Sequence, residues 1–93
     1  MTISNNEQNR IKLVNVISKN LIFRSTANKL FDDINDINEP EIIIDFNKIQ
    51  SITRSFAHQY LINKRRSKKN IIDVNISPIV KNMFKLIEKT KSI

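Results

Sequence analysis

The stretch Glu41-Ile42-Ile43-Ile44-Asp45-Phe46, residues 41–46, decides the fold. It is short, almost continuously apolar and rich in β-branched isoleucine. This pattern is typical of a strand that is covered on both faces, as in parallel sheets flanked by helices. We therefore expect Ile42–Ile44 to form a central, buried strand. A position at the edge of a sheet, or in a helix, would contradict an α/β fold.

A helix and two short extended segments precede this strand. Upstream, the alternation of apolar and polar residues predicts a strand over about 10–15. Leu21–Phe23 forms either a second short strand or a packed loop. An amphipathic helix is predicted over about 26–35, with Ser25 as its N-cap, from apolar residues at helical spacing, which are Ala27, Leu30, Phe31 and Ile34.

The segments after the strand continue the alternation of helices and strands. A helix is predicted over about 54–65 and a strand over about 71–76, and Ser77-Pro78 is a typical start of a last helix. Strand followed by helix thus occurs three times. With right-handed crossovers, this order predicts an α/β fold, with a mainly parallel sheet of about three to four strands packed with about three helices.

The composition is that of one small folded domain. The chain has 93 residues, 40% of them hydrophobic, which is enough for a single core. The first nine residues are polar and predict a flexible N-terminus, so we assign the domain to residues 10–93. The longest apolar runs have three residues, whereas a membrane span needs roughly 20. Without a span or a secretory signal, we expect a cytoplasmic protein.

The residue types that are missing exclude several kinds of site. The chain has no cysteine, no glycine and one histidine, His58. These absences exclude disulfides, thiolate metal sites, multi-histidine metal cages and Gly-rich nucleotide loops. No convergent set of catalytic groups is recognisable either. We therefore expect a protein that binds other macromolecules, with no catalytic residues, metal or cofactor.

Positive charge is concentrated in the second half of the chain. Residues 1–46 carry five Lys and Arg against seven Asp and Glu, whereas residues 47–93 carry eleven against two. This half should bind polyanions weakly and in a salt-dependent manner. The candidate residues lie in the run at 64–69 and in the last helix; they are Lys64, Arg65, Arg66, Lys68, Lys69, Lys81, Lys85, Lys89 and Lys91.

One stretch, IIIDFNKIQSITRSFAHQYL at Ile42–Leu61, resembles the STAS-like family, small relatives of bacterial anti-anti-sigma factors. In that family a buried strand ends in Asp-Phe or Asp-Leu, a short loop follows, and a Ser-Phe-Ala segment opens the next helix. The upstream FRSTANKLF, residues 23–31, is also similar, and the resemblance covers about residues 10–90. Two positions differ: Thr53 stands where an Asp usually precedes the serine, and Phe56 where a Gly usually follows it.

The resemblance implies a regulatory protein-interaction module that works by partner switching. In the better-known relatives a histidine-kinase-like ATPase phosphorylates a serine at the start of this helix, which controls complex formation. The matching residue is Ser55. Its place at a helix N-terminus suits a phosphate, and Arg54 could pair with it. The expected partner surface comprises Asp45, Thr53, Arg54, Ser55, Phe56 and His58.

Simpler interpretations of these residues stay open. Ser55, or Thr53 in its place, could serve only as a helix cap, and Asp45 could simply accept hydrogen bonds from loop N–H groups. His58 is most typical of a surface or half-buried histidine, and the basic run at 64–69 of a solvated helix end.

Two wider questions also stay open. Asp32, Asp33 and Asp36 indicate an exposed helix face more than a metal site. The alternative function is a small nucleic-acid-binding protein that uses residues 64–69 and the last helix. The sequence leaves the oligomeric state undetermined, homo-oligomers included.

Overall fold

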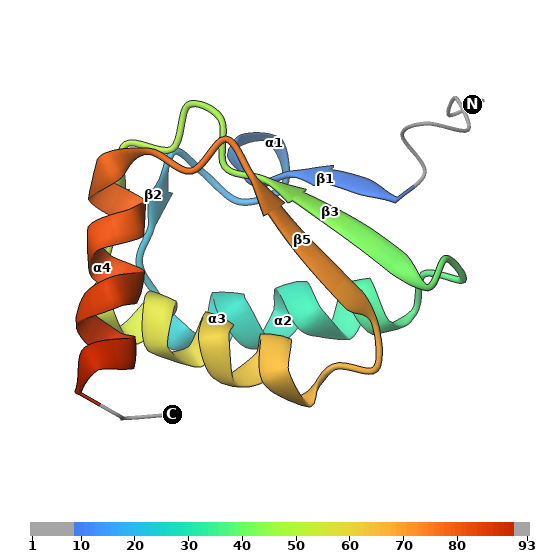
Figure 1. Cartoon of the computed structure of the whole chain (residues 1–93). Helices are drawn as coiled ribbons and strands as arrows, with labels where there is room; N and C mark the ends of the chain where they lie inside the picture. Colours follow the sequence, from blue (N-terminus) through green and yellow to red (C-terminus); the bar gives the residue numbers. More distant parts are fainter. Residues whose placement is uncertain (1–8, 91–93) are drawn as a thin grey trace.

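The main sheet of the protein has three parallel strands. The computed structural model describes residues 9–90. Strands β1 (Arg10–Lys12), β3 (Glu41–Asp45) and β5 (Asn70–Val74) lie in the order β1-β3-β5 (Figure 1). The predicted central strand is confirmed: β3 is paired on both sides, and Ile42 and Ile44 are completely buried.

Helices α2 (Arg24–Asn35) and α3 (Arg54–Arg66) lie side by side against one face of this sheet, and α4 (Pro78–Lys89) lies across one end (Figure 1). Ile42 and Ile44 point toward α2 and α3. Ile43 points to the opposite face and is only partly buried. The expected cover on both faces was therefore wrong, because α2 and α3 share a single face.

Several local boundaries differ from those expected. The first strand ends at Lys12, opposite Asp45, and residues 13–16 form a single helical turn, α1 (Leu13–Val16). The turn buries Leu13 completely. Helix α2 starts at Arg24 with Phe23 as its N-cap, so Ser25 lies inside the first turn and is not the cap.

A second, very small sheet was only partly expected. Strand β2 (Asn20–Leu21) pairs in parallel with β4 (Ser51–Ile52), which lies between the central strand and the helix predicted over about 54–65. Each of these strands leads directly into a helix, β2 into α2 and β4 into α3. The small sheet therefore holds the N-terminal ends of both helices at one end of the molecule (Figure 1).

The second half follows the sequence pattern closely. Helix α3 extends the predicted 54–65 by one residue, and α4 begins as expected at Pro78. The Ser77 hydroxyl accepts a hydrogen bond from the N–H of Val80 over 3.4 Å, which caps α4. The prediction of a flexible N-terminus concerns residues that, apart from Asn9, lie outside the described part of the chain. Lys91 lies outside it too.

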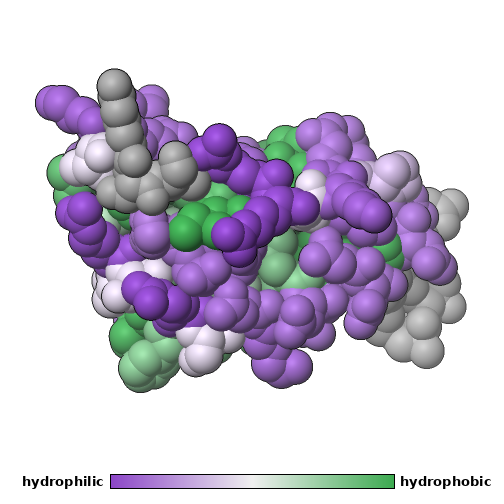
Figure 2. All heavy atoms as spheres, turned by 90° about the horizontal axis from the view of Figure 1, so that it is seen from below, coloured by the Kyte–Doolittle hydropathy of each residue, from purple (hydrophilic) through white to green (hydrophobic). Residues whose placement is uncertain are grey.

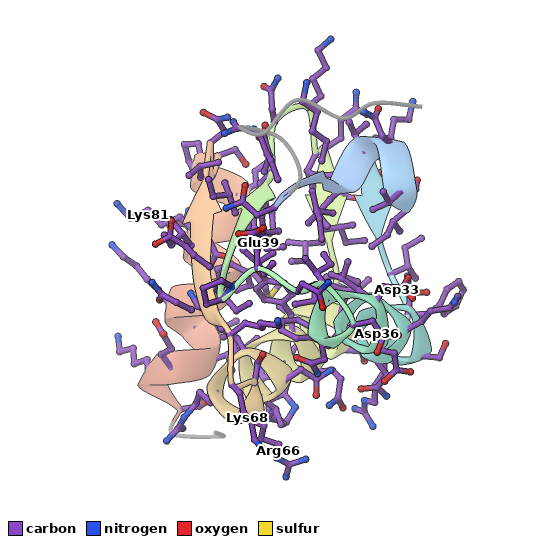
Figure 3. The ribbon with its side chains drawn as sticks, turned by 90° about the vertical axis from the view of Figure 1, so that its right-hand side faces the viewer. Asp33, Asp36, Glu39, Arg66, Lys68 and Lys81 are labelled. Carbon is purple, nitrogen blue, oxygen red and sulfur yellow. The ribbon has the colours of Figure 1, made fainter. Side chains whose placement is uncertain are left out.

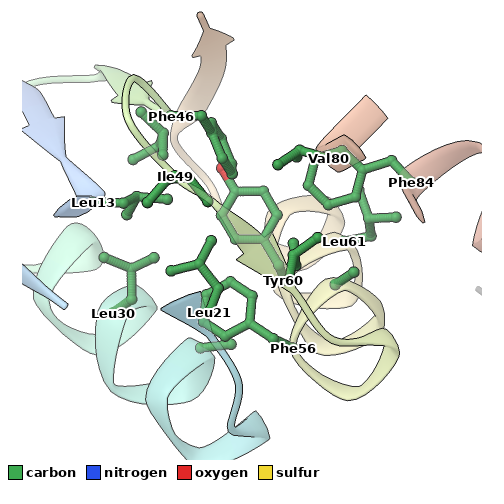
Figure 4. Close-up of a cluster of buried hydrophobic side chains, with 14 of the residues drawn as sticks. Leu13, Leu21, Leu30, Phe46, Ile49, Phe56, Tyr60, Leu61, Val80 and Phe84 are labelled. Atoms are coloured by element: carbon green, nitrogen blue, oxygen red, sulfur yellow. The ribbon is translucent and has the colours of Figure 1, made fainter. Parts of the chain in front are cut away.

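Aromatic rings form the centre of the core between the sheet and the helices. Tyr60 of α3 is completely buried and stacks with Phe84 at a centroid distance of 5.7 Å. Phe31 and Phe46 meet the same ring edge to face, at 5.3 and 5.6 Å. Figure 4 shows Phe46, Tyr60 and Phe84 close together in the core. Such aromatic pairs contribute about 0.5–1.5 kcal/mol each beyond the burial of their area. Tyr60 therefore links α2, α3 and α4 to the end of β3.

Candidate functional site

Thr53 connects the start of α3 to the start of α2. The Thr53 hydroxyl donates to the carbonyl oxygen of Ile22 over 2.6 Å and accepts from the N–H of Phe56 over 3.1 Å. Its backbone N–H donates to the carbonyl oxygen of Leu21 over 2.9 Å. These bonds hold the N-terminal ends of the two helices next to each other. They also make Thr53, and not Ser55, the N-cap of α3.

Ser55 lies in the first turn of α3 and has no capping role. Both Ser55 and Arg54 are exposed. The N-terminal end of a helix carries a partial positive charge and N–H groups without intrahelical partners. A negatively charged group on Ser55 would therefore lie in a favourable electrostatic environment.

Exposed apolar side chains lie beside Ser55. Ile22 and Phe23 keep 44% and 65% of their surface exposed, although Thr53 ties this segment to α3. Single exposed apolar residues are common, whereas contiguous apolar patches mark interaction sites. We call the group formed by Ile22, Phe23, Arg24, Arg54 and Ser55 the α3-start surface. The molecule is mostly hydrophilic in the view of Figure 2, with hydrophobic side chains in small patches.

The contribution of α2 to this surface was not foreseen, although the sequence contains a signal for it. Residues 24–27 read Arg-Ser-Thr-Ala and residues 54–57 read Arg-Ser-Phe-Ala. The two alanines, Ala27 and Ala57, are completely buried. Helices α2 and α3 also contact each other along their length. The repeated pattern thus marks two equivalent helix starts that lie side by side.

Of the residues expected at the partner surface, Phe56 and Asp45 are buried and His58 is only partly exposed. Phe56 is completely buried in the aromatic core, where its ring stacks with Tyr60. Asp45 is 2% exposed at the end of β3. His58 is half-buried on α3, one turn after Ser55. A helix has one face toward the core, and consecutive residues in its first turn cannot all be exposed.

Asp45 holds together the segments that follow β3 and β5. Its Oδ1 accepts from the N–H of Asn47 and from Nδ2 of Asn75, both over 2.9 Å, and its Oδ2 pairs with Arg10 at 2.9 Å. Burial by itself would raise the pKa of Asp45, but the hydrogen bonds from Asn75, Asn47 and Arg10 outweigh burial. The pKa of Asp45 is therefore lowered from 3.8. Asp45 thus accepts a hydrogen bond from a loop N–H group, which is the simpler of the two interpretations of this residue.

The basic run begins at the C-terminal end of α3, at the opposite end of this helix from Ser55. Two of its lysines have partners inside the molecule. Nζ of Lys64 lies 2.8 Å from Oδ2 of Asp73 on β5. Nζ of Lys69 donates to the carbonyl oxygens of Ile37 and Glu39, after α2. These two side chains therefore also stabilise the junctions of α3 and β5 with the rest of the fold.

The remaining cations of the run point outward. Arg65, Arg66 and Lys68 are exposed. In Figure 3, Arg66 and Lys68 lie at one end of α3, whereas the carboxylates of Asp33 and Asp36 lie on α2. Charges of opposite sign still come close together here, since Arg66 and Asp32 of α2 line the same hollow.

Two adjoining hollows form a groove between α3, β5 and α4, which we call the basic groove. Their volumes are about 510 and 410 Å³, and both are lined by Leu61, Lys64 and Glu88. The groove joins the run at 64–69 to the last helix, which the sequence presented as separate clusters. The cations that line it are Lys64, Arg65, Lys69, Lys81 and Lys85.

The described part of the chain offers no metal site. Within residues 9–90, no group of three or more His, Asp or Glu side chains is placed to hold an ion. Asp33 is instead exposed and lies 4.0 Å from Lys29 of the next turn. None of the helices in residues 9–90 has the length and apolar character needed to cross a membrane. Comparison with family models, curated proteins and solved structures finds no match to this chain.

Proposed function

We propose that this protein is a regulatory interaction module that docks a protein partner on the α3-start surface, under the control of phosphorylation at Ser55. The observation that carries the proposal is the exposure of Ser55 in the first turn of a helix that Thr53 already caps. The resemblance of Ile42–Leu61 to the STAS-like family supports it and suggests a histidine-kinase-like ATPase as the partner.

The surroundings of Ser55 suit both states of such a switch. Without a phosphate, the surface combines exposed Ile22 and Phe23 with the exposed cations Arg24 and Arg54, which favours a partner with apolar and acidic groups. A phosphate would add a charge of about −1.5 to −2 at pH 7. The two arginines and the helix N-terminus would stabilise that charge, but an acidic partner would be repelled.

The first test is intact-mass analysis after incubation with ATP and the histidine-kinase-like ATPase proposed as the partner. We expect a mass increase of one phosphate that is absent in Ser55→Ala. Ser25→Ala is the matched control, because Ser25 is exposed, follows an arginine and lies in the first turn of α2. Loss of the mass shift in Ser25→Ala but not in Ser55→Ala would contradict the assignment of the site.

The second test measures docking of the same ATPase to variants of this surface. Ser55→Asp should weaken binding and Phe23→Ala should weaken it as well, because Phe23 is the most exposed apolar side chain here. Ile79→Ala serves as the control, since Ile79 is a similarly exposed apolar residue, at 60%, on a different helix, α4. Unchanged binding in both Ser55→Asp and Phe23→Ala would reject the proposed function.

A further inference from the structure

The basic groove runs beside an unpaired strand edge. β5 is paired with β3 on one side, and no other strand within residues 9–90 pairs with it. The N–H of Asn70 and the carbonyl oxygen of Val74 bond toward the β3 side. Since alternate residues of a parallel strand direct their backbone groups to opposite edges, those of Ile71 and Asp73 point outward. Ile71 and Asp73 also line the groove.

Such an edge presents unpaired N–H and carbonyl groups with which another strand can pair. Here, cations surround it. Arg65, Lys81 and Lys85 form no ion pair within residues 9–90, whereas Asp73 is already neutralised by Lys64. Glu88 is the remaining carboxylate of the groove. A strand added to β5 would therefore have to be acidic.

The two faces of β5 specify the pattern of that strand. On the groove side, Leu61 and Ile71 line the hollow together with Lys64 and Arg65, which suits the methylene groups and carboxylate of a glutamate. On the other face, Ile72 and Val74 are partly exposed and would contact apolar side chains of the added strand. Alternate residues of an added strand point to opposite faces. The complementary sequence thus alternates acidic and apolar residues.

Nucleic acid fits this groove less well. Proteins that bind single strands stack the bases on aromatic side chains. Phe84 is the aromatic residue in the lining, and it is only 8% exposed. Tyr60 is completely buried. The positive charge would attract a polyanion, but the groove offers no ring on which bases could stack.

We propose that the basic groove binds an extended acidic segment of a protein partner, which adds to β5 as a further strand of the sheet. Its backbone pairs with Ile71 and Asp73, and its acidic side chains pair with Arg65, Lys81 and Lys85. The α3 residues that line this site, Leu61, Lys64 and Arg65, come after Ser55 in the helix, at about 9–15 Å along its axis. This site does not depend on the function proposed for the α3-start surface.

The affinity test uses a fluorescein-labelled decapeptide of alternating glutamate and valine, measured by fluorescence anisotropy at physiological salt. Replacing Lys81 and Lys85 together by glutamate should weaken binding about tenfold or more, as expected for two lost and reversed ion pairs. The matched control replaces Lys19 and Lys29, both exposed and distant from the groove, by glutamate. An equal loss in the control would show that net charge alone is responsible and would overturn the proposal.

A milder variant tests the same site without risk to the fold. Glu88 is exposed, lines both hollows and would repel an acidic peptide. Glu88→Gln should therefore tighten binding of the glutamate–valine peptide. Unchanged or weaker binding would argue against occupation of the groove.

Strand addition has its own signature. On binding of the peptide, amide hydrogen exchange at Ile71 and Asp73 should slow, because their N–H groups gain acceptors. N-methylation of the peptide at either all glutamates or all valines should abolish binding, and methylation of the other set should be tolerated. Equal effects of the two methylated peptides, or unchanged exchange at both residues, would refute strand addition. Tight binding of oligothymidylate at physiological salt, with no binding of the peptide, would assign the groove to nucleic acid.

Discussion

The hydroxyl of Tyr60 donates a hydrogen bond of 2.5 Å to Oδ1 of Asp73 and so joins the aromatic core to the edge strand β5. Nζ of Lys64 donates a hydrogen bond to the other carboxylate oxygen, Oδ2, over 2.8 Å. A carboxylate on the helix-facing side of a sheet is costly unless it is paired. Here, two side chains of α3, one turn apart, satisfy it and fix the wall of the basic groove.

Tyr60→Phe should lower the free energy of unfolding by about 1–3 kcal/mol, because the ring stays while Asp73 loses a hydrogen bond. Urea denaturation followed by far-UV circular dichroism measures this change. In the Asp73→Asn background the same substitution should cost less, since the charge that strengthens the bond is gone. Equal costs in the two backgrounds would show that the bond adds nothing specific.

The ionisation of Tyr60 should be displaced to high pH. Burial, with the negative charge of Asp73 and the hydrogen bond to it, raises the pKa of Tyr60 well above 10.0. Tyr60 stabilises the fold while it is protonated, so its contribution is complete below pH 10 and is lost as the pH rises through the raised pKa. Tyr60 is the single tyrosine, and there is no tryptophan. Phenolate absorbance should therefore rise together with alkaline unfolding, and a normal titration of the folded protein would contradict this.

Asp45 should contribute to the acid sensitivity of the protein. The pKa of Asp45 is lowered in the folded state. Its contribution to the stability of the fold is therefore complete above pH 3.8 and is lost as the pH falls through the pKa of the folded protein. Asp45→Asn should reduce stability by about 1–3 kcal/mol at neutral pH. It should also flatten the acidic limb of a plot of unfolding free energy against pH. An acidic limb as steep as that of the parent protein would remove Asp45 as its source.

Thr53 and Ser55 should differ sharply in their effects on stability. Thr53→Ala removes the cap of α3 and the bond to Ile22, so it should cost about 0.5–2 kcal/mol. Ser55→Ala, at an exposed position without a cap, should stay within about 0.5 kcal/mol of the parent. Thermal unfolding of both variants checks this. A costly Ser55→Ala would mean that Ser55 has a structural role.

The basic groove could not be predicted from the sequence. Lys64 and Lys85 are separated by a strand, a turn and most of α4, and their side chains meet at the same groove only because α4 lies beside α3. The α3-start surface was half predictable: the strand end and the serine were visible in the residues, whereas the contribution of Ile22 and Phe23 depends on the bond from Thr53.

The sequence by itself determined the alternation of strands and helices, the central place of β3 and the start of α4 at Ser77-Pro78. These features follow from local periodicity, β-branched runs and capping residues, which act within a few positions of one another. Only the tertiary structure decided that residues 13–16 turn into a helix, that Phe56 is buried beside exposed Ser55, and which cations share a groove. Those outcomes depend on which surfaces meet once the helices pack, and residues distant in the chain set them.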